Sequence, residues 1–69
     1  MAEITIPPIR LPEEPYTMAQ FECYADRAED YLNGVKQCIS TGGTNQVIQA
    51  CVNTTHNNYI AGLGICDTL

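Results

Sequence analysis

The 69-residue sequence has no tryptophan, one phenylalanine and only three lysine or arginine residues. With so few basic residues it cannot present the positive patch that phosphate backbones require, so we expect no nucleic-acid partner. No stretch approaches the length of a membrane span, and membrane contact is expected only through partners. A single histidine and the lack of a Cys-x-x-Cys pair argue against a zinc site. We therefore expect no metal and no cofactor.

Residue patterns that support catalysis are also missing. His56 has no Ser, Cys or Asp at a spacing that would build a nucleophile and its base. The acidic pairs Glu13-Glu14 and Glu29-Asp30 lie in a chain too small to offer the cleft that two-carboxylate chemistry needs. We therefore expect a protein that is not an enzyme, with no catalytic residue and no small-molecule substrate.

Cysteine is the residue that this short chain uses most distinctively. A domain of this size cannot bury a core that is stable without additional crosslinks, and four cysteines can provide them. Such use of cysteine implies an oxidising compartment. Met1 is followed by Ala2, Glu3 and a proline-broken stretch rather than by a basic end and an apolar run, so no secretory signal is predicted. Either a leader has been removed, or the chain reaches an oxidising compartment without one.

A helix is predicted to start directly after Thr17. Thr17 as N-cap and Gln20 three residues later form a capping box, and Tyr16 is placed to pack against Phe21 from the preceding position. Apolar residues then recur with helical periodicity. We expect this helix to cover residues 18–40.

A second helix is predicted after a glycine-containing turn. Gly42-Gly43 suits a helix C-cap and a turn. The helix that follows is expected to cover residues 45–62. Gly62 and Gly64 are expected to end it, which leaves Cys66 on the final turn or just beyond.

The cysteine spacing selects one disulfide pairing for two such helices. Cys23 and Cys38 are 15 residues apart, as are Cys51 and Cys66, and within one helix that separation is about 22 Å. A disulfide needs Cα atoms within roughly 7 Å. Pairing Cys23 with Cys51 would need parallel helices, which the short turn cannot connect. The bonds Cys23–Cys66 and Cys38–Cys51, nested in an antiparallel hairpin, remain.

Both bonds follow one register, because facing residues of an antiparallel hairpin have position numbers of constant sum and each pair sums to 89. The same sum predicts three further facing pairs: Arg27 with Gly62, Tyr31 with Asn58, and Gly34 with Thr55. A glycine costs about 1 kcal/mol in a helix interior. Close approach of the two backbones would explain Gly34; the alternative is that Asn33-Gly34 marks a helix end.

The first helix carries two further faces. Its apolar stripe consists of Phe21, Ala25, Ala28, Leu32, Val35 and Ile39. The stripe lies about 120° from the cysteine seam, so the second helix cannot cover both. We expect Phe21, Leu32, Val35 and Ile39 to bind a partner. Glu22, Asp26, Glu29 and Asp30 form an acidic stripe, which either faces solvent or docks a basic protein.

Residues 1–16 are predicted to be an extended docking arm, and residues 17–69 the disulfide-linked hairpin. Four prolines rule out a helix in the arm. Its apolar residues, Ile4, Ile6, Ile9 and Leu11, are too many for a segment that stays in water, so the arm is expected to lie on its own hairpin or on a neighbouring protein. Ile4 and Ile6 alternate as in an edge strand. A disordered arm is the alternative.

The pattern Cys23-x14-Cys38-x12-Cys51-x14-Cys66 resembles the twin Cx(n)C, or coiled-coil-helix-coiled-coil-helix (CHCH), proteins of the mitochondrial intermembrane space. Most members place fewer residues between the paired cysteines. The longer spacing, the size and the acidity are similar to those of the acidic hinge subunit of respiratory complex III, although its long acidic run is absent here. The resemblance implies a helical hairpin with nested disulfides, import by oxidative folding without a cleaved presequence, and service as an accessory subunit.

These observations together predict an all-α structural protein that docks on a larger assembly. The expected assembly is a respiratory-chain complex of the mitochondrial inner membrane, contacted on its intermembrane-space side, and the expected partners are its other protein subunits. Two alternatives remain: a secreted or periplasmic binding module, such as an inhibitor or a toxin-like ligand, and a virion accessory protein.

Overall fold

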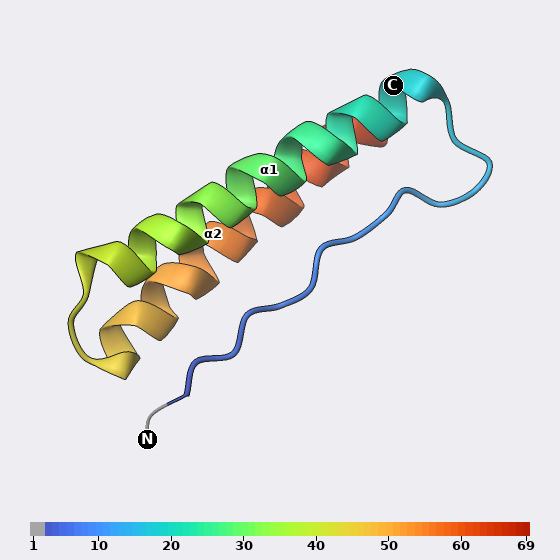
Figure 1. Ribbon diagram of the computed structural model, residues 1–69. Helices are drawn as coiled ribbons and strands as arrows, with labels where there is room; N and C mark the ends of the chain where they lie inside the picture. The colour runs from blue at the N-terminus through green and yellow to red at the C-terminus, as the bar shows by residue number, and fades with distance from the viewer. Residues whose placement is uncertain (1–2) are drawn as a thin grey trace.

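Two antiparallel helices form a hairpin, and an extended N-terminal arm runs along it (Figure 1). The computed structural model describes residues 3–69 and has helices α1 (Met18–Thr41) and α2 (Asn45–Cys66). The predicted all-α hairpin with a non-helical arm is confirmed. Residues 3–69 contain no strand, so the edge strand suggested by Ile4 and Ile6 is wrong. Residues 1–2 of the predicted arm lie outside the described part of the chain.

The start of α1 matches the local sequence signal. The Thr17 hydroxyl accepts a hydrogen bond from the Gln20 backbone N–H at 3.1 Å, and the Gln20 side chain accepts one from the Thr17 N–H at 3.0 Å. Tyr16 stacks on Phe21 with ring centroids 6.0 Å apart. The predicted capping box and the contact between the flanking aromatic residues are both confirmed, and together they fix where the arm joins the helix.

The turn between the helices depends on two glycines. Gly42 and Gly43 have φ angles of 77° and 111°, which residues with a Cβ rarely adopt. The Gly42 N–H donates to the Ile39 carbonyl at 3.1 Å and ends α1. Thr44 is the N-cap of α2, and its hydroxyl accepts a hydrogen bond from the Val47 N–H at 3.2 Å. The chain therefore reverses within three residues, as an antiparallel hairpin requires.

The predicted end of α2 near residue 62 is wrong, because the helix continues to Cys66; the expectation that Cys66 lies on the final turn is confirmed. Gly62 is buried, and a Cβ there would lie 3.0 Å from Cδ of Arg27. Gly62 thus gives room for the Arg27 side chain from α1 rather than ending the helix. The Asp67 N–H still donates to the Leu63 carbonyl at 3.0 Å, so the helical hydrogen-bond pattern extends past both glycines.

Both predicted disulfides are present. The Cα atoms are 5.6 Å apart in Cys23–Cys66 and 5.7 Å apart in Cys38–Cys51. A Cβ on Gly34 would lie 2.7 Å from Cγ2 of Thr55, which confirms that the two backbones approach closely there. Because Gly34 lies inside α1, the alternative that it marks a helix end is wrong.

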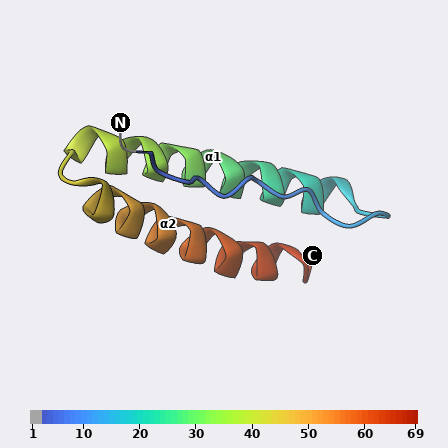
Figure 2. The same ribbon diagram turned by 90° about the horizontal axis from the view of Figure 1, so that it is seen from below.

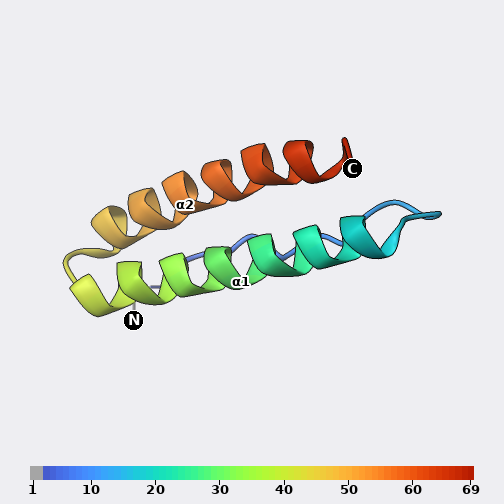
Figure 3. The same ribbon diagram turned by 90° about the horizontal axis from the view of Figure 1, so that it is seen from above.

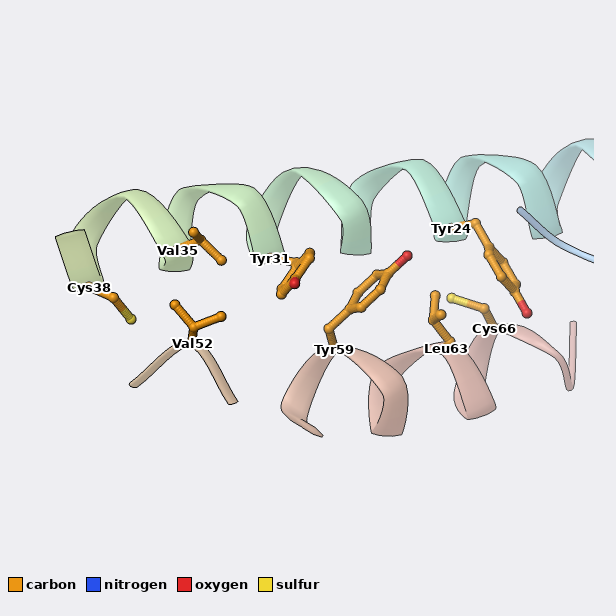
Figure 4. Packing of buried hydrophobic residues seen from close by; sticks show 8 residues of the cluster. All are labelled: Tyr24, Tyr31, Val35, Cys38, Val52, Tyr59, Leu63 and Cys66. Atoms are coloured by element: carbon orange, nitrogen blue, oxygen red, sulfur yellow. The ribbon is translucent and has the colours of Figure 1, made fainter. Parts of the chain in front are cut away.

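The core lies beside the disulfide seam, between the two helices (Figure 4). Its buried side chains are Tyr24, Tyr31, Val35, Cys38, Val52, Tyr59, Leu63 and Cys66. Tyr31 stacks on Tyr59 with centroids 4.7 Å apart and planes at 12°. Two stacked aromatic rings therefore fill the middle of the interface between the two helices.

Candidate docking surface

The arm is attached to the hairpin through its backbone. The Thr5 N–H donates to Oε1 of Gln49 at 2.8 Å, and Nε2 of Gln49 donates to the Thr5 carbonyl at 2.9 Å. The Tyr31 hydroxyl donates to the Pro7 carbonyl at 2.8 Å. These bonds satisfy main-chain groups of a segment that has no secondary structure of its own.

A fourth hydrogen bond shows that the arm runs parallel to α2. The Arg10 N–H donates to the Tyr59 hydroxyl at 3.0 Å. From Thr5 to Arg10 the arm covers about 15 Å at the rise of a polyproline helix, and from Gln49 to Tyr59 α2 also covers about 15 Å. Five residues of the arm therefore span the same length as ten residues of α2. The arm runs along the hairpin from its closed end to its open end (Figure 2).

The arm ends against a polar contact at the open end of the hairpin. Pro12 is buried there, and the Tyr24 hydroxyl donates a hydrogen bond to the Asp67 carboxylate. This hydrogen bond, followed by burial and by the negative charge of Asp67, raises the pKa of Tyr24, while the charge of Arg10 acts in the opposite direction. Burial, with a smaller contribution from Tyr59, raises the pKa of Tyr31.

Most apolar side chains of the arm keep a large part of their accessible surface. Ile4 packs partly against the core. Ile6, Ile9 and Leu11 are exposed, and Leu11 retains 75% of its accessible surface. The backbone is thus bound to the hairpin, which is one of the two options predicted for the arm. Ile6, Ile9 and Leu11 keep exposed surface, and their contact with a partner stays a prediction.

The predicted apolar stripe on α1 is divided by the fold. Val35 is only 4% exposed and belongs to the core, where it offers no surface to a partner. Phe21, Leu32 and Ile39 are exposed. The arm covers these side chains only in part: Tyr16 stacks on Phe21, and Phe21 and Leu32 line a groove together with Ile9 and Leu11.

The arm and α1 enclose an open groove of about 590 Å³. Ile9 and Leu11 form the arm wall, and Phe21 and Leu32 line it from α1. The other lining residues are Arg10, Tyr24, Ala25, Ala28, Glu29, Asn33 and Lys36. Four of the eight predicted partner-binding residues are therefore brought to one site. Ile4, Ile6 and Ile39 lie outside the groove lining.

Charged residues follow the α1 edge of this groove. Glu22, Glu29 and Lys36 recur every seven residues and so lie in one row on the helix. Glu29 and Lys36 line the groove itself. Glu22 lines a neighbouring shallow hollow together with Asp26 and Asp30. The edge is acidic toward the start of α1 and basic toward its end. Figure 3 shows α1 from the side away from the arm.

Sequence reasoning missed the tyrosines and Gln49 that bind the arm. A signal for the core face was present: Tyr24, Ala28, Tyr31, Val35 and Cys38 alternate spacings of four and three, the pattern of a helix that packs against another helix. No local pattern marks Gln49, since its partner Thr5 is 44 positions away in the sequence.

His56 is the single histidine of the sequence. His56 is half-buried, and its ring meets that of Tyr31 edge-on at 5.8 Å. Within residues 3–69, no three His, Cys, Asp or Glu side chains come together as a possible metal site. Neither of the two helices is long and apolar enough to cross a membrane. The chain matches no protein-family model, no curated protein and no solved structure.

Proposed function

We propose that the protein is a non-enzymatic accessory subunit that docks on a larger assembly through the arm and α1. The observation that carries this proposal is the arrangement of the arm. Four hydrogen bonds to its backbone fix it to the hairpin, while Ile6, Ile9 and Leu11 keep 42%, 48% and 75% of their accessible surface. Apolar side chains on a pre-ordered segment lose little conformational entropy when a partner covers them. Single soluble chains rarely expose a large contiguous apolar patch.

The proposed assembly is a respiratory-chain complex, contacted on the intermembrane-space side of the mitochondrial inner membrane. Support comes from all four cysteines being in disulfides, which persist in oxidising compartments. The hairpin with two nested disulfides is also consistent with the CHCH-like proteins that the cysteine spacing resembles. Other subunits of that complex would be the partners, and any membrane contact would run through them.

The test is retention of the protein in native extracts of its source cells. A tagged chain at natural abundance should co-migrate with a large inner-membrane complex. The double variant Ile9→Ser/Leu11→Ser should be released, because it removes the two most exposed apolar side chains of the arm and keeps the Arg10 backbone bond to Tyr59. The matched control is Ile65→Ser, near the end of α2 and outside the groove, because the 60% exposure of Ile65 lies between those of Ile9 and Leu11.

Two results would count against the proposal. Recovery of the intact protein as a free small species from every extract would favour a secreted or periplasmic binding module. Equal retention of the double variant and the wild-type chain would show that the arm is not the docking element.

A further inference from the structure

The arm lies on a face of the hairpin that is formed by Gln49, Tyr31 and Tyr59. Within residues 3–69, four hydrogen bonds join the arm to the helices, and each of them uses a main-chain atom of the arm. Every peptide carries main-chain carbonyls, and every residue except proline carries an N–H, so these bonds do not depend on the side chains of the arm. The face therefore recognises the extended backbone of the arm more than its sequence.

The contacts of the arm follow the repeat of a polyproline helix, which has three residues per turn. Ile4 and Pro7 are half-buried, and the next residue of this series, Arg10, donates its N–H to a core tyrosine. Ile6 and Ile9, which precede Pro7 and Arg10, are exposed. Proline at position 7 holds φ near the value of this helix and has no N–H to satisfy. One edge of an extended, proline-containing segment thus meets the hairpin.

The hairpin side of this contact has the chemistry of a site for proline-containing peptides. Such peptides dock in grooves lined by aromatic rings, and Tyr31 and Tyr59 supply two stacked rings whose hydroxyls also bond the arm. The Gln49 amide is oriented by Asn53, whose Oδ1 accepts a hydrogen bond from Nε2 of Gln49 at 3.0 Å. The same amide bonds both the N–H and the carbonyl of Thr5. Contacts within the hairpin therefore position each group that binds the backbone.

We propose that this face is a binding site for extended, proline-containing segments. The arm occupies it in the isolated chain, and a segment of the same kind from a partner protein takes its place. The arm is held weakly enough to be exchanged, because both Gln49 bonds are open to solvent and water can replace them. Of its isoleucine and leucine residues only Ile4 packs against the core. This inference goes beyond the proposed function, since it concerns the hairpin face beneath the arm.

A segment of a partner protein is favoured over the arm of a second copy. Two copies that exchange arms form the same contacts that each copy forms alone, so the exchange gains no contact and costs the entropy of association. A partner segment differs from the arm at the positions of Ile6, Ile9 and Leu11, where the four backbone bonds do not depend on the side chain. Its side chains there are free to add contacts that the arm does not make.

The first test uses the full-length, oxidised chain with the substitutions Thr5→Pro and Arg10→Pro. These release the arm by removing the N–H groups that donate to Gln49 and Tyr59, and they leave the helices unchanged. The probe is a labelled peptide with the sequence of residues 3–12. It should bind the released-arm variant with saturation at millimolar concentrations. It should bind the wild-type chain at least about tenfold more weakly, because the tethered arm has an effective concentration in the millimolar range.

The NMR signals of the Gln49 side-chain amide should shift when the probe binds, which locates it at the proposed site. Circular dichroism and disulfide mapping confirm that the released-arm variant folds. The single variant Thr5→Pro, which disturbs the arm less, should bind the probe to an intermediate degree. Absence of saturable binding to both variants would overturn the proposal.

Two altered probes separate backbone recognition from apolar attraction. One probe is methylated at the backbone nitrogens of Thr5 and Arg10, so it keeps every side chain and loses both donors. It should bind at least about tenfold more weakly than the unmodified probe. The other probe has serine in place of Ile6, Ile9 and Leu11, and it should bind more tightly than the methylated probe. The reverse order would show that apolar side chains hold the peptide, and the proposal would be wrong.

A substitution in the hairpin tests the site from the other side. Gln49→Ala, introduced into the released-arm variant, should weaken binding of the probe by about tenfold, because two backbone bonds are lost. The matched control is Gln46→Ala, at an exposed position of the same helix that takes part in none of the four bonds. Equal affinity of these two variants for the probe would contradict the assigned site.

The peptide site and the proposed function can fail separately. A chain whose released-arm variant binds the probe, but which is not retained in any native extract, supports the site and refutes the accessory-subunit role. A chain that is retained, but whose released-arm variant binds no probe, shows the reverse. Sedimentation of the wild-type chain as a dimer with exchanged arms would overturn a partner protein as the occupant.

Discussion

The Tyr31 hydroxyl donates a hydrogen bond to the Pro7 carbonyl at 2.8 Å, and this bond joins the middle of α1 to the middle of the arm. Tyr31 is also stacked on Tyr59, whose hydroxyl accepts from the Arg10 N–H. The two central core rings thus carry the polar groups that hold the arm. Core packing and the position of the arm are therefore coupled. A substitution at Tyr31 or Tyr59 should change both the packing of the core and the position of the arm.

Tyr31→Phe is expected to loosen the arm without unfolding the hairpin. The ring can keep its stacking on Tyr59, but Pro7 loses its donor, at a cost of about 1 kcal/mol. Trypsin should then cleave after Arg10 several-fold faster in the variant. Tyr16→Phe is the control, since Tyr16 stacks on Phe21 at the surface. Equal cleavage rates in wild-type protein and Tyr31→Phe would contradict the role of this bond.

Gly34→Ala is expected to destabilise the protein although alanine favours helices. The new Cβ would lie 2.7 Å from Cγ2 of Thr55, so the helices must separate, at a cost of about 1–3 kcal/mol. Gly64→Ala is the matched control, because nothing lies within 4 Å of its Cβ position; it should stabilise α2 by up to about 1 kcal/mol.

The compensating variant for this clash is Gly34→Ala/Thr55→Ser, which removes the methyl group that the new Cβ would meet. It should recover much of the lost stability in denaturant unfolding. If Gly34→Ala proves as stable as wild type, the close contact between the helices near the inner disulfide is not present in solution.

Alkaline pH is expected to release the arm. The folded protein holds the pKa of Tyr24 and of Tyr31 above the usual value of about 10. For groups shifted in this direction, the contribution to stability is complete below pH 10 and is lost as the pH rises through the raised folded-state values. Ionised Tyr31 can no longer donate to Pro7.

Tyrosinate absorbance should therefore develop in two phases, with Tyr24 and Tyr31 ionising last and together with faster cleavage after Arg10. In Tyr31→Phe the alkaline loss of stability should be smaller. Because all four cysteines are in disulfides, no thiol is present to start disulfide exchange under these conditions. A single phase near the usual tyrosine pKa would contradict this prediction.

The inner disulfide is expected to be reduced before the outer one. Cys51 is exposed, whereas Cys66 is completely buried and Cys23 is half-buried. A thiolate must reach a sulfur atom to open the bond, so access decides the order. Brief treatment with a mild reductant, followed by alkylation and peptide mapping, should label Cys38 and Cys51 first. If Cys23 and Cys66 are labelled first, local unfolding at the open end of the hairpin exposes the outer disulfide, and the exposure of the cysteines in the folded state does not decide the order.

Loss of the inner disulfide should destabilise the hairpin but leave it linked at its open end. In the chain-entropy model, a loop of 13 residues accounts for about 3 kcal/mol. The paired variant Cys38→Ser/Cys51→Ser should lower the free energy of unfolding by about that amount in urea.

The sequence by itself determined the hairpin. The capping box at Thr17, the glycines at 42 and 43 and the spacing of the cysteines are short-range signals, and each has a local physical meaning. The constant sum of the disulfide pairs then fixed the register, including the close contact of Gly34 with Thr55. Local signals predicted the end of α2 incorrectly. Gly62 has the pattern of a helix end, but it lies inside the helix and leaves room for the Arg27 side chain of α1.

Only the tertiary structure decided which face of α1 is buried and where the arm lies. Two heptad-like stripes on α1 share Ala28 and Val35. The disulfide register predicted that Tyr31 and Cys38 of one stripe face α2, but not that Tyr24 and Val35 are buried with them. Tyr59 and Val52 on α2 bury the stripe that contains Tyr24 and Tyr31, which leaves Phe21 and Leu32 exposed. The position of the arm depends on hydrogen bonds between residues 24 to 49 positions apart. Such bonds have no periodicity in the sequence, because they exist only once the two tyrosine rings have been brought together.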